Sequence, residues 1–135
     1  MKRRTIPTEA QEQMAVVQWF ASYAPTRGMD ARLLCCSANG AVLAGDARMR
    51  AIQMNRLKKM GLVVGDPDLF LRKAMSTFSG LYIEMKRSNW SSNGKWDKHN
   101  ITQASVRRML SIDYAVRVCC GADEAIKVIQ EYLAL

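Results

Sequence analysis

The stretch Gly80–Lys86, with the sequence GLYIEMK, carries the strongest fold signal in the chain. Side chains alternate between the two faces of a β-strand, so the three apolar residues Leu81, Ile83 and Met85 share one face. Glu84 and Lys86 share the other face with a tyrosine. The apolar face suits a hydrophobic core. The polar face places a carboxylate beside an ammonium group within a sheet, and a solvated ion pair is the simplest interpretation of that arrangement.

The preceding stretch, GDPDLFL at residues 65–71, favours a catalytic interpretation. Asp68 opens a second apolar strand, and Pro67 fixes the backbone just ahead of it. A β-hairpin of the two strands would bring Asp68 close to Glu84. Two neighbouring carboxylates repel each other unless a cation lies between them, and oxygen-rich sites suit Mg²⁺ or Mn²⁺. Lys86 can then stabilise the negative charge that develops on a phosphate.

Helical and extended patterns alternate along the whole chain in the order α-β-α-β-β-α-β-α. Thr8 and Gln11 form a capping box, and the helix that they begin should end before Pro25. This order predicts an α/β fold with a mixed sheet flanked by helices. The remaining predicted elements are a strand at 32–37, a turn at Asn39–Gly40, a helix from the cap Asp46 to Met60, the hairpin, a polar loop at 88–99, a helix from the cap Asn100 to Ser111, a strand at 114–120 and a helix at 122–133.

Composition points to a small basic protein with reduced cysteines. The 135 residues form one domain, 1–135, and carry a formal net charge of +8, which is typical of polyanion binders. The cysteines occur as two adjacent pairs, Cys35–Cys36 and Cys119–Cys120, without metal-ligand spacing, and one member of each pair should pack in the core. No apolar run is long enough to span a bilayer and no signal peptide is visible, so we expect no membrane partner and a cytoplasmic location.

Basic residues are concentrated on the predicted helix from Asp46 to Met60. They can contact DNA phosphates, and the alternative is a merely solvated helix face. The DNA-binding candidates are Arg48, Arg50, Arg56, Lys58 and Lys59.

Pro67–Asp68 followed by Glu84-x-Lys86 resembles the PD-(D/E)XK nuclease signature. The surrounding residues resemble the VRR-NUC branch of that superfamily, and the resemblance runs from about Thr8 to Leu135. The matching pieces are Glu9-x-x-x-Gln13, Asn39–Gly40, Gly61, Gly65-x-Pro-Asp-Leu, Leu-x-Ile-Glu-Met-Lys86, Gln103 and Tyr114-x-Val, followed by the C-terminal helix.

The resemblance also implies a role for each matching residue. Asp68 and Glu84 would ligate the metal, the backbone carbonyl of Met85 would add a ligand, and Lys86 would position the attacking water or stabilise the transition state. A glutamate of the first helix would complete the site through water. The assigned residues are Glu9, with Glu12 as the fallback, and Gln103, which would lie near the site.

The resemblance further implies a restriction-endonuclease-like core and a Mg²⁺- or Mn²⁺-dependent endodeoxyribonuclease that leaves a 5′-phosphate. Stand-alone phage and bacterial members resemble Holliday-junction resolvases, which implies branched DNA, a homodimer, and a bacterial or phage-infected cell. Val128, Tyr132, Leu133 and Leu135 offer one self-contact patch, although core packing is the alternative for them and is favoured for Val128. The competing functions are a non-catalytic nucleic-acid-binding module that retains the fold and a protein-interaction subunit without DNA affinity.

Overall fold

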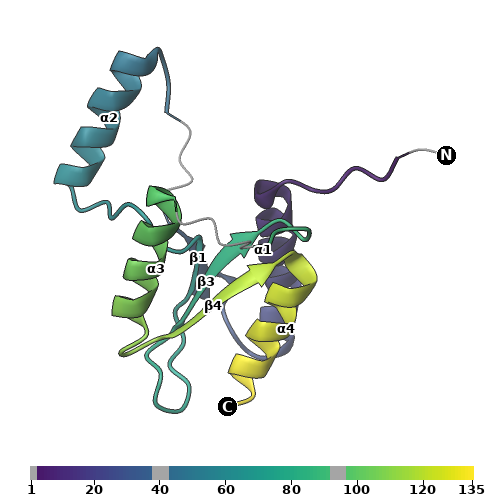
Figure 1. Ribbon diagram of the computed structural model, residues 1–135. Helices are drawn as coiled ribbons and strands as arrows, with labels where there is room; N and C mark the ends of the chain where they lie inside the picture. The colour runs from purple at the N-terminus through teal and green to yellow at the C-terminus, as the bar shows by residue number, and fades with distance from the viewer. Residues whose placement is uncertain (1–2, 38–42, 92–96) are drawn as a thin grey trace.

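The computed structural model describes residues 3–37, 43–91 and 97–135 (Figure 1). A four-stranded mixed sheet has helices on both faces, which confirms the predicted α/β class and the predicted order of elements. The elements are α1 (Glu9–Thr26), the short 3₁₀ helix η1 (Ala31–Leu33), β1 (Leu34–Cys36), α2 (Ala47–Lys59), β2 (Leu69–Leu71), β3 (Leu81–Lys86), α3 (Lys98–Leu110), β4 (Ala115–Cys120) and α4 (Ala122–Leu133).

The strands lie in the order β1-β2-β3-β4. The first two pairs are antiparallel and β3 pairs with β4 in parallel, so β2 and β3 form the predicted hairpin. Leu69 pairs with Ile83 in this hairpin. Continuing that register by one residue places Asp68 across from Glu84, at the end of the sheet where β3 finishes.

The hydrophobic core lies between the sheet and the two helices α1 and α4. Leu81, Ile83 and Met85 are buried on this face of β3, as their alternation predicts. The helices cover them with a short row of residues each: Val16, Phe20 and Ala24 from α1, and Ala125, Ile129 and Tyr132 from α4.

The other face of the sheet lies against α3 and begins with an aromatic cluster. The rings of Phe70 and Tyr82 stack with their centroids 4.3 Å apart, and Tyr114 meets Tyr82 edge-on at 5.1 Å. Beyond the aromatic rings, Glu84 and Lys86 are only 3% and 7% exposed. The solvated ion pair is therefore the wrong interpretation of this face.

Two predicted helix ends are wrong, whereas the Thr8 and Asp46 caps and both ends of α4 are confirmed. Thr8 and Gln11 form the expected capping box, and the Asp46 carboxylate caps α2 through the Met49 N–H. Helix α1 continues through Pro25 to Thr26, because a proline near the last turn removes only one hydrogen bond and already has a helical φ. Helix α3 begins earlier than expected.

Asp97, not Asn100, is the N-cap of α3, and its carboxylate accepts a hydrogen bond from the Asn100 N–H. Both residues have cap chemistry, and the earlier one adds nearly a full turn of helix. The predicted turn at Asn39–Gly40 and residues 92–96 of the predicted loop lie outside the described residues.

The cysteine prediction holds for one pair only. All four thiols are free; Cys119 is buried and Cys120 is half-buried, as alternation on a strand predicts. In the other pair, Cys35 is half-buried and Cys36 is exposed. Strand β1 begins only at Leu34, and this leucine occupies the core position that we assigned to a cysteine.

Helix α2 stands away from the rest of the molecule (Figure 1). None of its residues is buried, in contrast to α1, α3 and α4. At the other end of the chain, Tyr132 is buried and its hydroxyl donates to the Lys73 carbonyl, so core packing explains this member of the proposed self-contact patch. No helix among the described residues has both the length and the apolarity needed to cross a bilayer.

Candidate active site

Asp68 is held at the end of the β2–β3 hairpin by the backbone of both neighbouring strands. Its carboxylate oxygen Oδ2 accepts a 2.7 Å hydrogen bond from the Met85 N–H, and its carbonyl accepts one from the Ser37 N–H. The N–H and C=O of one strand residue point the same way, so the Met85 carbonyl also faces the Asp68 side of β3. The predicted ligands Asp68, Glu84 and Met85 therefore meet at one end of the sheet.

Glu84 has one satisfied and one unsatisfied carboxylate oxygen. Its Oε1 accepts a 2.9 Å hydrogen bond from the Gln103 amide of α3. Its Oε2 is buried and has no hydrogen-bond partner among the described residues. A buried carboxylate oxygen without a partner destabilises the fold, so its presence indicates a role that the protein alone does not fulfil.

The electrostatics of Glu84 lead to the same conclusion. Its pKa is raised to about 8, mainly by burial and then by the negative charge of Asp68 and a hydrogen bond with the Asp68 carboxyl group. Lys86 and Arg107 act in the opposite direction. The two carboxylates thus repel each other across the hairpin, and a cation between them would relieve the repulsion.

Lys86 lies beside this carboxylate pair and is oriented by three groups. Its Nζ donates to the Gln103 Oε1 at 3.2 Å and lies 3.7 Å from the Glu84 Oε1. The Trp90 ring covers it, with the ring centroid 5.5 Å from Nζ. Gln103 thus bridges Glu84 and Lys86 through one amide group, donating to the first and accepting from the second.

Gly65 allows α3 to approach closely enough for this bridge. Its φ of +93° favours glycine, and a Cβ at this position would lie 3.1 Å from the Thr102 side chain and 3.3 Å from the Gln103 backbone nitrogen. The loop that follows carries the fully buried Pro67 directly into Asp68. The same short segment therefore positions both Asp68 and Gln103.

The two glutamates of α1 occupy different surroundings. Glu9 is exposed and lines a groove of about 990 Å³ together with Gln13, Cys36 and Asp68. Glu12 instead accepts a 2.6 Å hydrogen bond from the Ala122 N–H, where Gly121 offers no side chain to cap α4. Glu9 consequently shares a groove with Asp68, whereas Glu12 already caps another helix.

Two further residues lie near the site, and the sequence analysis missed both. The Ser37 hydroxyl, like the Glu84 Oε2, is buried without a partner in the described part of the chain, and its backbone bonds Asp68. Arg107 lies one helical turn after Gln103 and is close enough to lower the pKa of Glu84. Helical spacing from Gln103 could have indicated Arg107, but no pattern pointed to Ser37.

The residues present fit a divalent cation. Asp68, Glu84 and the Met85 carbonyl are hard oxygen donors, which Mg²⁺ and Mn²⁺ prefer, and one of those oxygens is buried and unpaired. The described residues contain no cluster of three or more acidic, histidine or cysteine side chains. Water would therefore complete the coordination, as is usual for Mg²⁺.

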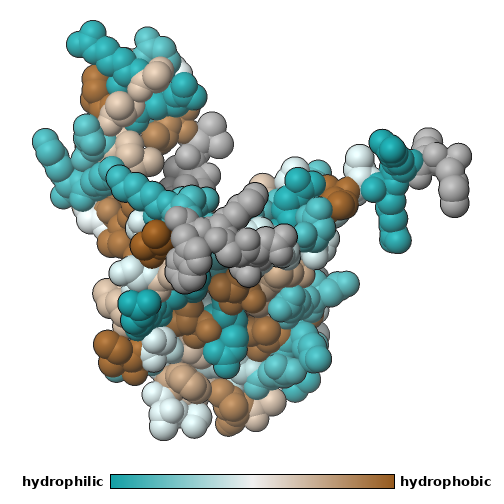
Figure 2. Space-filling view, in the orientation of Figure 1, coloured by the Kyte–Doolittle hydropathy of each residue, from teal (hydrophilic) through white to brown (hydrophobic). Residues whose placement is uncertain are grey.

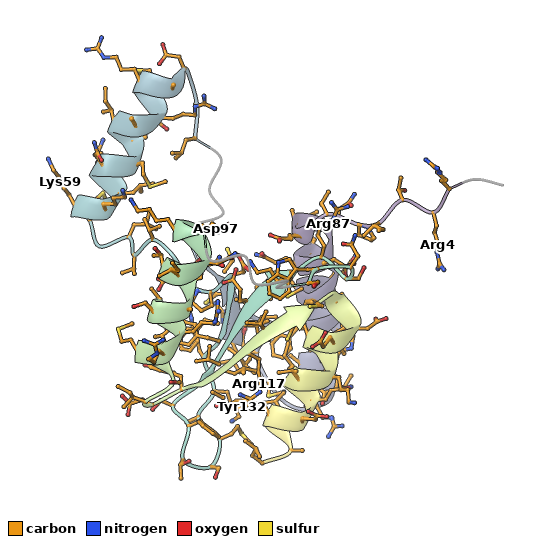
Figure 3. All side chains as sticks on the ribbon, viewed as in Figure 1. Arg4, Lys59, Arg87, Asp97, Arg117 and Tyr132 are labelled. Atoms are coloured by element: carbon orange, nitrogen blue, oxygen red, sulfur yellow. The ribbon has the colours of Figure 1, made fainter. Side chains whose placement is uncertain are left out.

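The predicted DNA-binding residues are all on the projecting helix and all exposed. Figure 3 shows Lys59 at the edge of the molecule, on the helix that stands away from the sheet. The set comprises Arg48, Arg50, Arg56, Lys58 and Lys59.

Comparison with solved structures gives a close match in fold. A structure described as a VRR_NUC domain protein superposes with a TM-score of 0.74 and 25% sequence identity, over 98% of this chain and 93% of the matched one. The chain is thus similar over nearly its whole length to a VRR-NUC domain protein. Its fold is therefore that of a nuclease-family domain. Comparisons with protein-family models and with curated proteins gave no match.

The raised pKa of Glu84 predicts how stability depends on pH. A carboxyl group that binds its proton more tightly when folded makes the metal-free protein lose stability between about pH 4.5 and pH 8. Glu84→Gln should remove this loss, because the new amide can donate to Asp68 and carries no charge. At pH 8 we expect a gain of about 1–3 kcal/mol, seen as a melting temperature several degrees higher in EDTA.

The exposed Glu131→Gln on α4 is the matched control and should follow the parent at every pH. The interpretation fails if Glu84→Gln melts at or below the parent temperature at pH 8, or if its advantage is the same at pH 5.

Proposed function

We propose that this protein, which is similar to a VRR-NUC domain protein, is a Mg²⁺- or Mn²⁺-dependent endonuclease that hydrolyses phosphodiester bonds of DNA. One observation carries the proposal: a buried carboxylate oxygen of Glu84 has no partner and faces a second carboxylate, that of Asp68. A site arranged only for stability would pair or remove such a group. Metal-dependent nuclease chemistry requires such a carboxylate, because a cation must be held beside the scissile phosphate.

Each side chain of the site has a separate role in this proposal. Asp68, Glu84 and the Met85 carbonyl would hold the cation, which when bound supplies Lewis-acid stabilisation of the phosphate and lowers the pKa of a coordinated water. Lys86 donates to an oxygen of the phosphate as negative charge develops there. Gln103 keeps the Lys86 ammonium in place through the 3.2 Å hydrogen bond. Glu9, in the groove shared with Asp68, orients water from the open side.

The first prediction from this proposed function concerns Asp68→Asn. The asparagine carbonyl can still accept the Met85 N–H, so folding and DNA affinity should stay near those of the parent. Cleavage should fall by roughly 100-fold or more, because the residue no longer supplies a charged ligand. The measurement is nicking of a labelled duplex with Mn²⁺ and with Mg²⁺. Full Mn²⁺-dependent activity of the variant would refute the role of Asp68, and an inactive parent would favour the non-catalytic binding module.

The second prediction concerns the projecting helix α2. Charge reversal of Arg48, Arg50 and Lys59 should weaken binding to all DNA sequences alike and flatten the salt dependence, by a slope of about 0.9 for each lost phosphate contact. Charge reversal of Arg27, Lys73 and Lys127, which are exposed elsewhere, is the matched control. Equal behaviour of the two triple variants in a salt titration would mean that α2 is only a solvated helix.

The third prediction concerns the substrate. We propose branched DNA, cut by a homodimer, because paired incisions across a four-way junction need two sites of opposed polarity and each chain supplies one. Four-way junctions should be cut in preference to linear duplex, and light scattering at micromolar concentration should give twice the 15.2 kDa mass of the chain. A monomer that nicks flaps but leaves junctions intact would refute the resolvase activity and leave the nuclease proposal standing.

A further inference from the structure

We infer that the N-terminal segment, residues 3–8, is a second DNA-binding element: an arm that holds phosphates on the opposite side of the active site from α2. The inference rests on the proposed function, since it supposes that DNA lies at the carboxylate site. It concerns residues to which the family resemblance gave no role.

The base of the arm is fixed to the strand that carries the active site. Arg87 directly follows Lys86, and alternation directs the two side chains to opposite faces. The Arg87 guanidinium donates from Nε to the Pro7 carbonyl at 3.3 Å and from Nη2 to the Ile6 carbonyl at 3.1 Å. The capping box at Thr8 then begins α1. The direction in which the segment leaves the protein is therefore set within a few residues of Lys86.

The outer end of the arm carries positive charge that nothing nearby neutralises. Arg3 and Arg4 are exposed, and the sequence has no acidic residue before Glu9. Neither arginine takes part in an ion pair among the described residues, and Figure 3 shows Arg4 well away from the body of the protein. Two guanidinium groups on an extended backbone suit a polyanion, because they can bind successive phosphates.

The position of the arm explains why DNA is the partner. The arm and α2 project from opposite sides of the end of the sheet where β3 finishes, and Arg87 lies between them (Figures 1 and 3). Figure 2 shows hydrophilic side chains on both projections. A six-residue extended segment spans at most about 20 Å, so the arm reaches phosphates several nucleotides from the one at Lys86. DNA that crosses the active site would contact both projections.

The test measures binding of the full-length protein to a fluorescent duplex in EDTA, so that no cleavage occurs, over a series of salt concentrations. Arg3→Ala/Arg4→Ala should weaken binding several-fold at low salt and reduce the slope of log K against log salt by about 2. Lys73→Ala/Lys127→Ala removes the same charge from exposed positions away from this end of the sheet, and should leave the slope unchanged.

A double-mutant cycle with Arg87→Ala tests whether the hydrogen bonds from Arg87 to Ile6 and Pro7 hold the arm in place. If Arg87 holds the arm in place, Arg3→Ala/Arg4→Ala should cost less affinity in the Arg87→Ala protein than in the parent. The inference is overturned if the arm variant matches the Lys73/Lys127 control or if the cycle is additive. A parent that neither binds nor cuts DNA would instead refute the proposed function, so the two failures are distinguishable.

Discussion

The pairing of β2 with β3 is the constraint on which the rest of the molecule depends. It fixes the apolar face of β3 against α1 and α4, and the same register brings Asp68 beside Glu84 on the opposite face. The core and the candidate site thus lie on opposite faces of one hairpin. A one-residue slip would exchange these faces, placing Glu84 and Lys86 in the hydrophobic core and Leu81 and Ile83 at the candidate site. The hydrophobic effect that stabilises the core therefore also maintains the geometry of the site.

The site itself opposes folding. A carboxylate with an unpaired buried oxygen and a neighbouring negative charge lowers the stability of the metal-free protein. The surrounding structure compensates for this in part: Gln103 supplies one hydrogen bond, Lys86 supplies a positive charge, and Gly65 lets α3 approach closely enough for both contacts. Such local conflict between stability and chemistry is expected where a protein holds charges ready for a ligand.

Sequence patterns predicted those parts of the fold that depend on local physics. The alternation of GLYIEMK, the Thr8 capping box and the limits of α4 all match the structure, because each depends on residues close together in the chain. The predicted start of α3 was wrong because two residues three positions apart have the same cap chemistry. For the site, the hairpin pattern placed Asp68 near Glu84, whereas the family resemblance pointed to Gln103.

What could not be predicted depends on contacts between distant segments. The bond from Glu12 to the first turn of α4 joins residues 110 positions apart, and no spacing rule distinguishes it from the groove position of Glu9. The unpaired hydroxyl of Ser37 and the bonds of Arg87 to the N-terminal segment are likewise visible only in three dimensions. The stacking of Trp90 over Lys86 belongs to the same class.

Helix α2 has a consequence for how this protein can evolve. Since none of its residues is buried, substitutions along it leave the core and its stability nearly unchanged. Its folding is supported locally, by the Asp46 cap and by the Gln53 side chain, which bonds both the N–H and the C=O of Ala44. Mutations in the β2–β3 hairpin, by contrast, must preserve both the packing of the core and the geometry of the carboxylate site. Core packing does not constrain α2, so its sequence can change quickly and adapt to new partners while the hairpin remains the same.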